Sequence, residues 1–270
     1  MSLVEKGFRS VDNTKRREGG SAFEDRAAFS RQITVVFEER PEVVSQPAPL
    51  QGAALAPGSM AAEDFRLLRT KVRGIAQERP FGCLGIVSAT PGEGKTTIAI
   101  GLAAALADSA DRRVLFVEAD LRRPAVEEYL GVPRSPGLAE WLDGSALSIP
   151  LRRITPQGFW LLSAGDASLS SPDALGSPRM AALLDACREQ FDTIVVDGPP
   201  LAPVADSVML QDSIDGFLLV VRARHAPRDV IQRAVSHLRP ERVAGVVFND
   251  QQEVFPGYSF SYAYGRPRQR

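Results

Sequence analysis

A run of small and polar residues directly after a short apolar segment has the composition needed to hold a phosphate group. The run is Ala89-Thr90-Pro91-Gly92-Glu93-Gly94-Lys95-Thr96, and an apolar, alanine-rich segment follows it at once. In a strand–loop–helix unit, the backbone N–H groups of such a loop turn inward around a phosphate, and its glycines permit the close approach. The residues expected to bind the nucleotide phosphates are Pro91, Gly92, Glu93, Gly94, Lys95, Thr96 and Thr97.

Within this loop, Lys95 is expected to contact the β- and γ-phosphates, and Thr96 to offer its hydroxyl to Mg²⁺. Ala89 stands where the first glycine of such a loop usually stands, and a small residue is tolerated there. The sequence therefore predicts a protein that binds ATP with Mg²⁺.

Acidic residues end two further apolar runs. Asp197 ends the run 193–197, and Glu118 and Asp120 follow the run 114–117. Ligands bind at the carboxyl ends of strands in open α/β sheets, so these acids are expected near the phosphate loop. We expect Thr96, Asp120 and Asp197 to hold the metal, and Glu118 or Asp120 to accept a proton from an attacking hydroxyl. The predicted catalytic residues are Lys95, Glu118, Asp120 and Asp197.

Short apolar runs alternate with helical patterns along most of the chain. The predicted strands are 84–87, 114–117, 160–162, 194–196, 217–221 and 243–248, and the predicted helices are 96–107, 177–190, 205–211 and 227–238. Apolar positions at helical spacing predict a further helix near residues 65–75. Apolar strands separated by helices indicate an α/β fold: a mostly parallel sheet covered on both faces, in three layers.

Composition divides the chain into three parts. Residues 1–60 are expected to be a mobile extension and linker, in which the β-like run 33–37 docks elsewhere, and residues 61–250 to form the P-loop domain. Residues 251–270 are expected to be a flexible tail, which carries three of the four tyrosines: Tyr258, Tyr262 and Tyr264.

Net charge, hydropathy and cysteine content argue against several classes of protein. A formal net charge of −1 over 270 residues gives no argument for binding nucleic acid or membrane lipid. No apolar run approaches the roughly 20 residues that cross a bilayer, and no signal peptide precedes the domain. Only Cys83 and Cys187 are present, which is typical of reduced, buried thiols in a cytosolic protein. We therefore expect a soluble protein without a transmembrane segment.

Together these motifs resemble those of the bacterial tyrosine kinases (BY-kinases), cytoplasmic autokinases of capsule and exopolysaccharide export. The resemblance covers about residues 61–264. It rests on the loop 88–96, on Glu118-Ala119-Asp120-Leu121-Arg122-Arg123-Pro124, on Gly137-Leu138-Ala139-Glu140-Trp141-Leu142-Asp143-Gly144, on Ser177-Pro178-Arg179-Met180 and on Asp197-Gly198-Pro199-Pro200. It implies a P-loop NTPase fold with the deviant Walker A motif of the MinD/ParA superfamily, and an ATP- and Mg²⁺-dependent protein-tyrosine autokinase. The family usually has Asp where Glu118 stands.

The resemblance also implies partners. Glu63, Arg66 and Arg69 match the family's Glu-x-x-Arg-x-x-Arg motif, which mediates assembly of a ring-like homo-oligomer. Arg66, Arg69 and Arg73 are predicted to form one stripe of a helix, beside its apolar stripe. Within such a ring, a neighbouring subunit phosphorylates the tail tyrosines in trans. A separate membrane protein of polysaccharide export is the implied activator, which would place this chain at the inner membrane only through that partner.

Two other functions stay open. A positioning ATPase of the ParA/MinD sort shares the fold, but it carries a signature lysine at the position of Thr90, and this chain does not. A non-catalytic scaffold of a polysaccharide export system could use bound nucleotide only to control assembly. A phosphotyrosine assay with ATP and Mg²⁺ separates the three.

Overall fold

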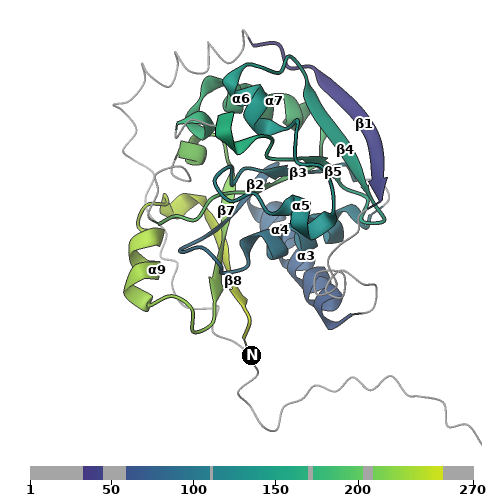
Figure 1. The fold of residues 1–270 in the computed structure, drawn as a ribbon. Coiled ribbons are helices and arrows are strands. Elements are labelled where there is room, and N and C mark those ends of the chain that lie inside the picture. Colours follow the sequence, from purple (N-terminus) through teal and green to yellow (C-terminus); the bar gives the residue numbers. More distant parts are fainter. Residues whose placement is uncertain (1–32, 45–58, 110–111, 170–172, 203–208, 252–270) are drawn as a thin grey trace, which may run out of the picture.

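A single eight-stranded sheet forms the centre of the computed structural model, which describes residues 33–44, 59–109, 112–169, 173–202 and 209–251. The strand order is β1-β4-β5-β3-β6-β2-β7-β8, and every pair is parallel except β4 with β5 (Figure 1). The strands are β1 Phe37–Val44, β2 Cys83–Ser88, β3 Val114–Glu118, β4 Ile149–Thr155, β5 Trp160–Leu162, β6 Thr193–Asp197, β7 Gly216–Arg222 and β8 Val243–Asn249.

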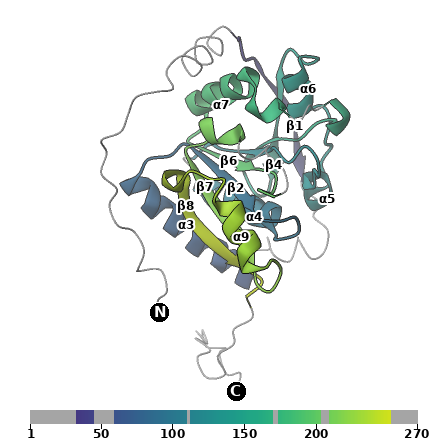
Figure 2. The ribbon, with the colours of Figure 1, turned by 90° about the vertical axis from the view of Figure 1, so that its left-hand side faces the viewer.

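Helices cover both faces of this sheet, which confirms the three-layer α/β expectation. On one face, α6 and α7 pack over the sheet together with α9; on the other lie α3, α4 and α5 (Figures 1 and 2). The α-helices are α3 Met60–Glu78, α4 Lys95–Ala107, α5 Val126–Leu130, α6 Leu138–Asp143, α7 Pro178–Gln190 and α9 Arg228–Val235, and short 3₁₀ turns are η1 Ala167–Leu169, η2 Ala174–Gly176, η3 Leu210–Asp212 and η4 Pro240–Arg242.

The central strands form where uninterrupted apolar runs predict them. Every residue of β2 and β3 is buried, because helices cover both of their faces. All six predicted strands are present, each within two residues of its expected limits. The predicted helix 205–211 falls mostly on residues outside the described ranges; its end meets the 3₁₀ turn η3.

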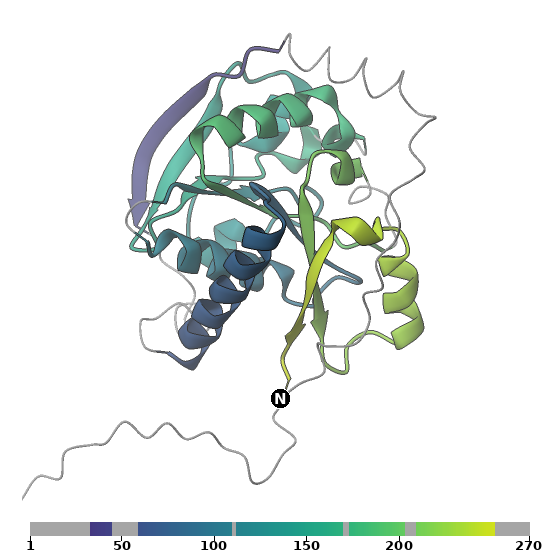
Figure 3. The same ribbon diagram turned by 180° about the vertical axis from the view of Figure 1, so that it is seen from behind.

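One edge of the sheet differs from the sequence expectation. β1 comes from the segment that we assigned to the N-terminal extension, and it pairs with β4, a strand that the pattern did not predict (Figure 3). The run 33–37 does contact the domain, since Ile33, Val35 and Phe37 pack against the core beneath α6 and α7. The strand itself begins only where that run ends. The extension as a separate unit of 60 residues stays untested, but its residues 37–44 belong to the sheet.

None of the helices in the described ranges is both long and apolar enough to cross a bilayer.

Candidate nucleotide-binding site

The phosphate loop connects the buried central strand β2 to helix α4. Gly92 and Gly94 have φ angles of 83° and 90°, a region that only glycine enters without strain. Gly94 is the N-cap of α4, and no side chain caps the helix, so its first N–H groups remain available to an anion. Ala89 is not among the described residues with positive φ, which explains why a side chain is accepted where the first glycine usually stands.

Glu93 holds the loop from inside. Its side chain is fully buried, and its Oε2 accepts hydrogen bonds from the backbone N–H groups of Ala89 at 2.8 Å and Thr90 at 3.4 Å. Glu93 was predicted to contact phosphate through its backbone N–H group, whereas its carboxylate binds the start of the loop. Only the backbone of Glu93 is then available to a nucleotide.

Three residues support the loop from outside: one ends β7, one lies shortly after it, and one ends β8. The Asn249 side-chain amide donates to the carbonyl oxygen of Glu93 at 2.9 Å, and His225 Nε2 lies 2.9 Å from the carbonyl oxygen of Pro91. Arg222 Nη1 donates to the carbonyl oxygen of Gly92 at 3.4 Å. The sequence analysis predicted none of the three. Asn249 could have been found, because it is a polar residue at the end of an apolar run, as Asp197 is.

Lys95, Thr96, Asp120 and Asp197 converge as the sequence predicted. Lys95 Nζ lies 2.7 Å from Asp120 Oδ2 and 4.0 Å from Asp197 Oδ1. The Thr96 hydroxyl donates to Asp197 Oδ2 at 2.6 Å. The alignment of the strands produces this cluster, because Asp197 of β6 lies opposite Ile86 of β2, just before the loop.

The electrostatics of the cluster follow from burial. Burial raises the pKa of Asp197 to about 6, against the opposing effects of the Lys95 ammonium and the Thr96 hydroxyl. For Lys95, burial acts to lower the pKa, but the carboxylates of Asp197 and Asp120 outweigh it, so the pKa is raised and the ammonium stays charged. The site therefore holds a fixed positive charge beside a carboxylate that is costly to ionise.

Glu118 ends β3 opposite Asp197 of β6, and backbone N–H groups bind its carboxylate. Its Oε1 accepts hydrogen bonds from the backbone N–H groups of Ala125 at 2.6 Å and Val126 at 2.8 Å, and its Oε2 accepts one from Ala164 at 3.0 Å. These contacts tie the end of β3 to the start of α5 and to the loop after β5. Burial raises the pKa of Glu118, and the three backbone N–H groups oppose that shift. Asp120, rather than Glu118, contacts Lys95.

Thr97, the last predicted loop residue, meets Tyr129 of α5, whose hydroxyl lies 2.9 Å from Thr97 Oγ1. Tyr129 is the single tyrosine outside the tail. The predicted phosphoacceptors Tyr258, Tyr262 and Tyr264 lie outside the described residues.

The predicted assembly residues lie on α3, and they already have partners within the chain. Arg66 pairs with Glu63, and both are largely exposed. Arg69 Nη1 donates to the carbonyl oxygen of Ala105 at 2.9 Å, at the carboxyl end of α4, and Arg73 Nη2 donates to the Ser109 hydroxyl at 2.8 Å. The expected arginine stripe is present, but two of its three members hold α3 against α4.

The donor set suits Mg²⁺ bound together with nucleotide. Asp197 Oδ1 is buried and lacks a hydrogen-bond partner, and the Thr96 hydroxyl lies beside it. Mg²⁺ prefers oxygen ligands and takes only one or two from protein in phosphate sites, so an all-protein cage is not required. The described ranges contain no group of three or more His, Cys, Asp or Glu side chains that could hold a metal ion.

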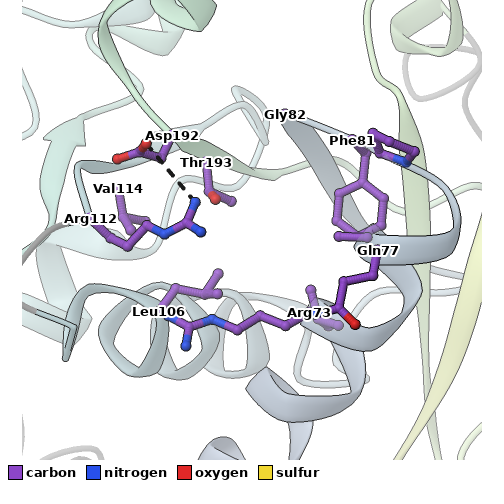
Figure 4. Close-up of a pocket in the computed structure, with 12 residues that line it drawn as sticks. Arg73, Gln77, Phe81, Gly82, Leu106, Arg112, Val114, Asp192 and Thr193 are labelled. Atoms are coloured by element: carbon purple, nitrogen blue, oxygen red, sulfur yellow. Dashed lines mark ion pairs between the residues drawn. The ribbon is translucent and has the colours of Figure 1, made fainter.

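A separate cavity of about 510 Å³ lies at the opposite edge of the sheet, where the parallel strands begin (Figure 4). Arg73 and Gln77 of α3 and Leu106 of α4 line it, and Arg112 lies 4.0 Å from Asp192 across one wall. It is distant from the loop because β2 separates the two, with Gly82 at one end and Ser88 at the other.

Fold and site together define a P-loop nucleotide-binding protein. Comparisons with known proteins identify its family. The family model of the CobQ/CobB/MinD/ParA nucleotide binding domain matches residues 84–253. The kinase domain of Escherichia coli tyrosine kinase ETK superimposes with a TM-score of 0.69 at 25% identity, over 93% of this chain and 100% of that one.

Curated relatives indicate the same family as the ETK kinase domain. The putative tyrosine-protein kinase EpsB of Ralstonia solanacearum is 32% identical over 80% of this chain, and the succinoglycan biosynthesis transport protein ExoP of Rhizobium meliloti is 36% identical over 72%. This chain spans only 29% and 25% of the length of these relatives. The chain belongs to the CobQ/CobB/MinD/ParA nucleotide-binding family and, within it, to the bacterial tyrosine kinases.

Proposed function

We propose that this chain is an ATP- and Mg²⁺-dependent protein-tyrosine autokinase that regulates exopolysaccharide synthesis and export. The observation that carries the proposal is the cluster of Lys95, Thr96, Asp120 and Asp197 beneath the phosphate loop. Relatives named as tyrosine-protein kinases, and one named for succinoglycan biosynthesis and transport, support it.

Within this proposal, the loop amides and Lys95 would bind the phosphates. Thr96 and Asp197 would hold Mg²⁺, whose chemical contribution would be to neutralise phosphate charge. Transfer forms a bond from the tyrosine oxygen to the γ-phosphorus and breaks the bond to ADP. The hydroxyl proton passes to Asp120, whose carboxylate lies at the cluster. Glu118 is the weaker candidate for proton acceptor, because three backbone N–H groups already occupy its oxygens.

The proposed substrates are the tail tyrosines Tyr258, Tyr262 and Tyr264 of a neighbouring copy in a ring-like oligomer. Glu63 and Arg66 are the exposed part of the α3 motif, so they are the better candidates for the first contact with that copy. Arg69 would join the contact only by leaving the carbonyl oxygen of Ala105. The implied activator is a membrane protein of polysaccharide export, through which the chain would be held at the inner membrane.

The test is to incubate the purified chain with ATP and Mg²⁺ and to measure phosphotyrosine. We expect a signal that disappears in Lys95→Met and after truncation at Gly257, which removes the three tail tyrosines. Nucleotide affinity, measured separately, should fall in Lys95→Met and stay unchanged in the truncated chain. If the wild type binds nucleotide but gains no phosphotyrosine, the kinase proposal is wrong, and the non-catalytic scaffold becomes the favoured function.

A further inference from the structure

Two arginines lie opposite each other on β1 and β4, the two neighbouring strands at one edge of the sheet. Arg40 of β1 lies directly opposite Arg152 of β4 in the parallel pairing of these strands. Side chains of residues that are opposite each other in a sheet project to the same face. Arg152 therefore projects to the same face of the sheet as Ile154, two residues further along β4. Ile154 packs in the core with α3, α4 and α5.

Neither guanidinium is fully satisfied. Only 8% of the Arg152 surface is exposed, and its Nη1 is buried without a hydrogen-bond partner, as is Nε of Arg40. A buried charge without a partner costs several kcal/mol, so structures seldom retain one without a use. Arg40 and Arg152 are the only arginines with such an atom in the described ranges.

The acid that pairs with Arg40 has a second partner. Glu38 Oε2 lies 3.0 Å from Arg40 Nη2 and accepts a hydrogen bond from the Ser148 hydroxyl, also at 3.0 Å. Glu38 therefore neutralises one of the two cations at most. Burial lowers the pKa of Arg152, and repulsion from the charge of Arg40 lowers it further.

Other partly buried arginines of this chain show how such a group is normally accommodated. Arg242 Nη1 donates to the carbonyl oxygen of Ile214 at 2.8 Å, and Arg188 Nη2 donates to that of Ser213 at 2.6 Å and to the Asp215 carboxylate at 3.1 Å. The fold thus supplies acceptors where an arginine serves only packing. Such acceptors are missing at Nη1 of Arg152 and at Nε of Arg40.

We propose that Arg40 and Arg152 form a binding site for an oxyanion, a phosphate or carboxylate group, and that its binding fastens β1 to the sheet. Guanidinium groups bind such oxyanions through paired N–H groups, which would satisfy both buried nitrogens at once. Such a contact would matter for β1 because, among the described strands, β1 lies at the end of the sheet and pairs with β4 alone. The register also shifts between Arg40 and Val43, so the pairing is irregular beside the site.

This site is independent of the phosphate loop and of the proposed kinase activity. Four strands, β4, β5, β3 and β6, lie between β1 and β2, which leads into the loop.

Amide hydrogen exchange of residues 37–44 in the full chain tests the proposal. The wild type is compared in chloride, inorganic phosphate and acetate at equal ionic strength, with Mg²⁺ and ADP at saturation in every sample. We expect phosphate to slow exchange in β1 by about tenfold, the factor that matches one charge-assisted hydrogen bond. Slowing by acetate as well would show that a carboxylate suffices; slowing by phosphate alone would assign the site to phosphate groups.

Arg152→Met is the decisive variant. Since it removes the uncompensated charge and keeps the apolar stem, β1 should exchange slowly in all three buffers. Arg40→Met, on the other strand, should behave in the same way. Agreement between the two variants would exclude a folding defect of one of them as the cause. Arg153→Met is the matched control, because Arg153 is exposed and adjacent in sequence; it should keep the response of the wild type. A wild type that does not respond to either oxyanion, or an Arg153→Met variant that resembles Arg152→Met, would overturn the proposal.

Discussion

At the scale of single residues, Asp197 illustrates a conflict between stability and binding. The carboxylate is buried, its Oδ1 lacks a partner, and its pKa is raised to about 6. A carboxyl whose pKa is higher in the folded state than in the unfolded state binds more protons when folded. Its contribution to the free energy of unfolding is therefore largest in acid and is lost as the pH rises from about 4 to about 6.

Asp197→Asn should consequently stabilise the nucleotide-free chain at pH 7.5, by on the order of 1–2 kcal/mol, because the amide need not be ionised. The same change should weaken Mg²⁺-dependent nucleotide binding strongly, since it removes the charged oxygen. Urea denaturation at pH 5 and pH 7.5, with nucleotide titrations in Mg²⁺ and in EDTA, measures both effects. A variant that is less stable than the wild type at pH 7.5 would contradict the proposed cost of this carboxylate.

The residues that sequence could locate are those with a strong local pattern. Lys95, Thr96 and Asp197 follow from a loop and a strand end, and the structure brings them together. Glu118 and Asp120 were both expected near the phosphate loop, as the acids that follow one apolar run. β3 ends at Glu118, so Asp120 lies just beyond the strand. Only the folded chain shows that Glu118 binds backbone N–H groups instead.

At the scale of elements, the contact between α3 and α4 depends on a missing side chain. Gly101 lies in the middle of α4, and a Cβ there would come within 2.4 Å of three ring atoms of Phe65 on α3. Phe65 is buried, so its ring has little room to move. Because α4 begins at the phosphate loop, this packing also holds the start of the site in place.

Gly101→Ala should therefore destabilise the chain by about 1–3 kcal/mol through overpacking, although alanine is the better helix former by about 1 kcal/mol. Gly74→Ala on α3 is the matched control: nothing lies within 4 Å of a Cβ there, so the change should stabilise the chain by about 0.5–1 kcal/mol. Urea unfolding of both variants measures the difference. If Phe65 is the obstacle, Phe65→Leu should restore part of the stability of Gly101→Ala. Equal stabilisation by both alanine substitutions would show that α3 and α4 do not meet there.

The elements that sequence missed are those that carry charge or are short. β1 reads Phe-Glu-Glu-Arg-Pro-Glu-Val-Val, and β4 contains Pro150, Arg152 and Arg153, so neither forms an apolar run. Charged residues and proline are typical of a strand at a sheet edge, which is the position of β1, and β4 is the next strand inward. α5 and α6 have five and six residues, too few to show a helical period.

At the scale of the whole molecule, the proposal of phosphorylation in trans raises the question whether the site acts on the tail of its own chain or on that of a second copy. The tail follows β8 directly, and the acceptor tyrosines begin at Tyr258, nine residues after Asn249. Nothing in this spacing requires that the tail of one chain serve the site of another. Transfer within one chain and transfer between two chains predict different results when defective copies are mixed.

Two complementary variants separate these routes. Lys95→Met keeps the tail but should lack phosphate transfer, whereas a chain truncated after Gly257 keeps the loop but lacks the acceptors. We expect neither to gain phosphotyrosine alone, and the Lys95→Met chain to gain it when the truncated chain, ATP and Mg²⁺ are added. The initial rate per acceptor should rise with the concentration of the truncated chain, because association must precede transfer. If wild-type chains were labelled at a rate independent of their concentration while the mixture stayed unlabelled, the site would act on its own tail, and the ring would not be needed for catalysis.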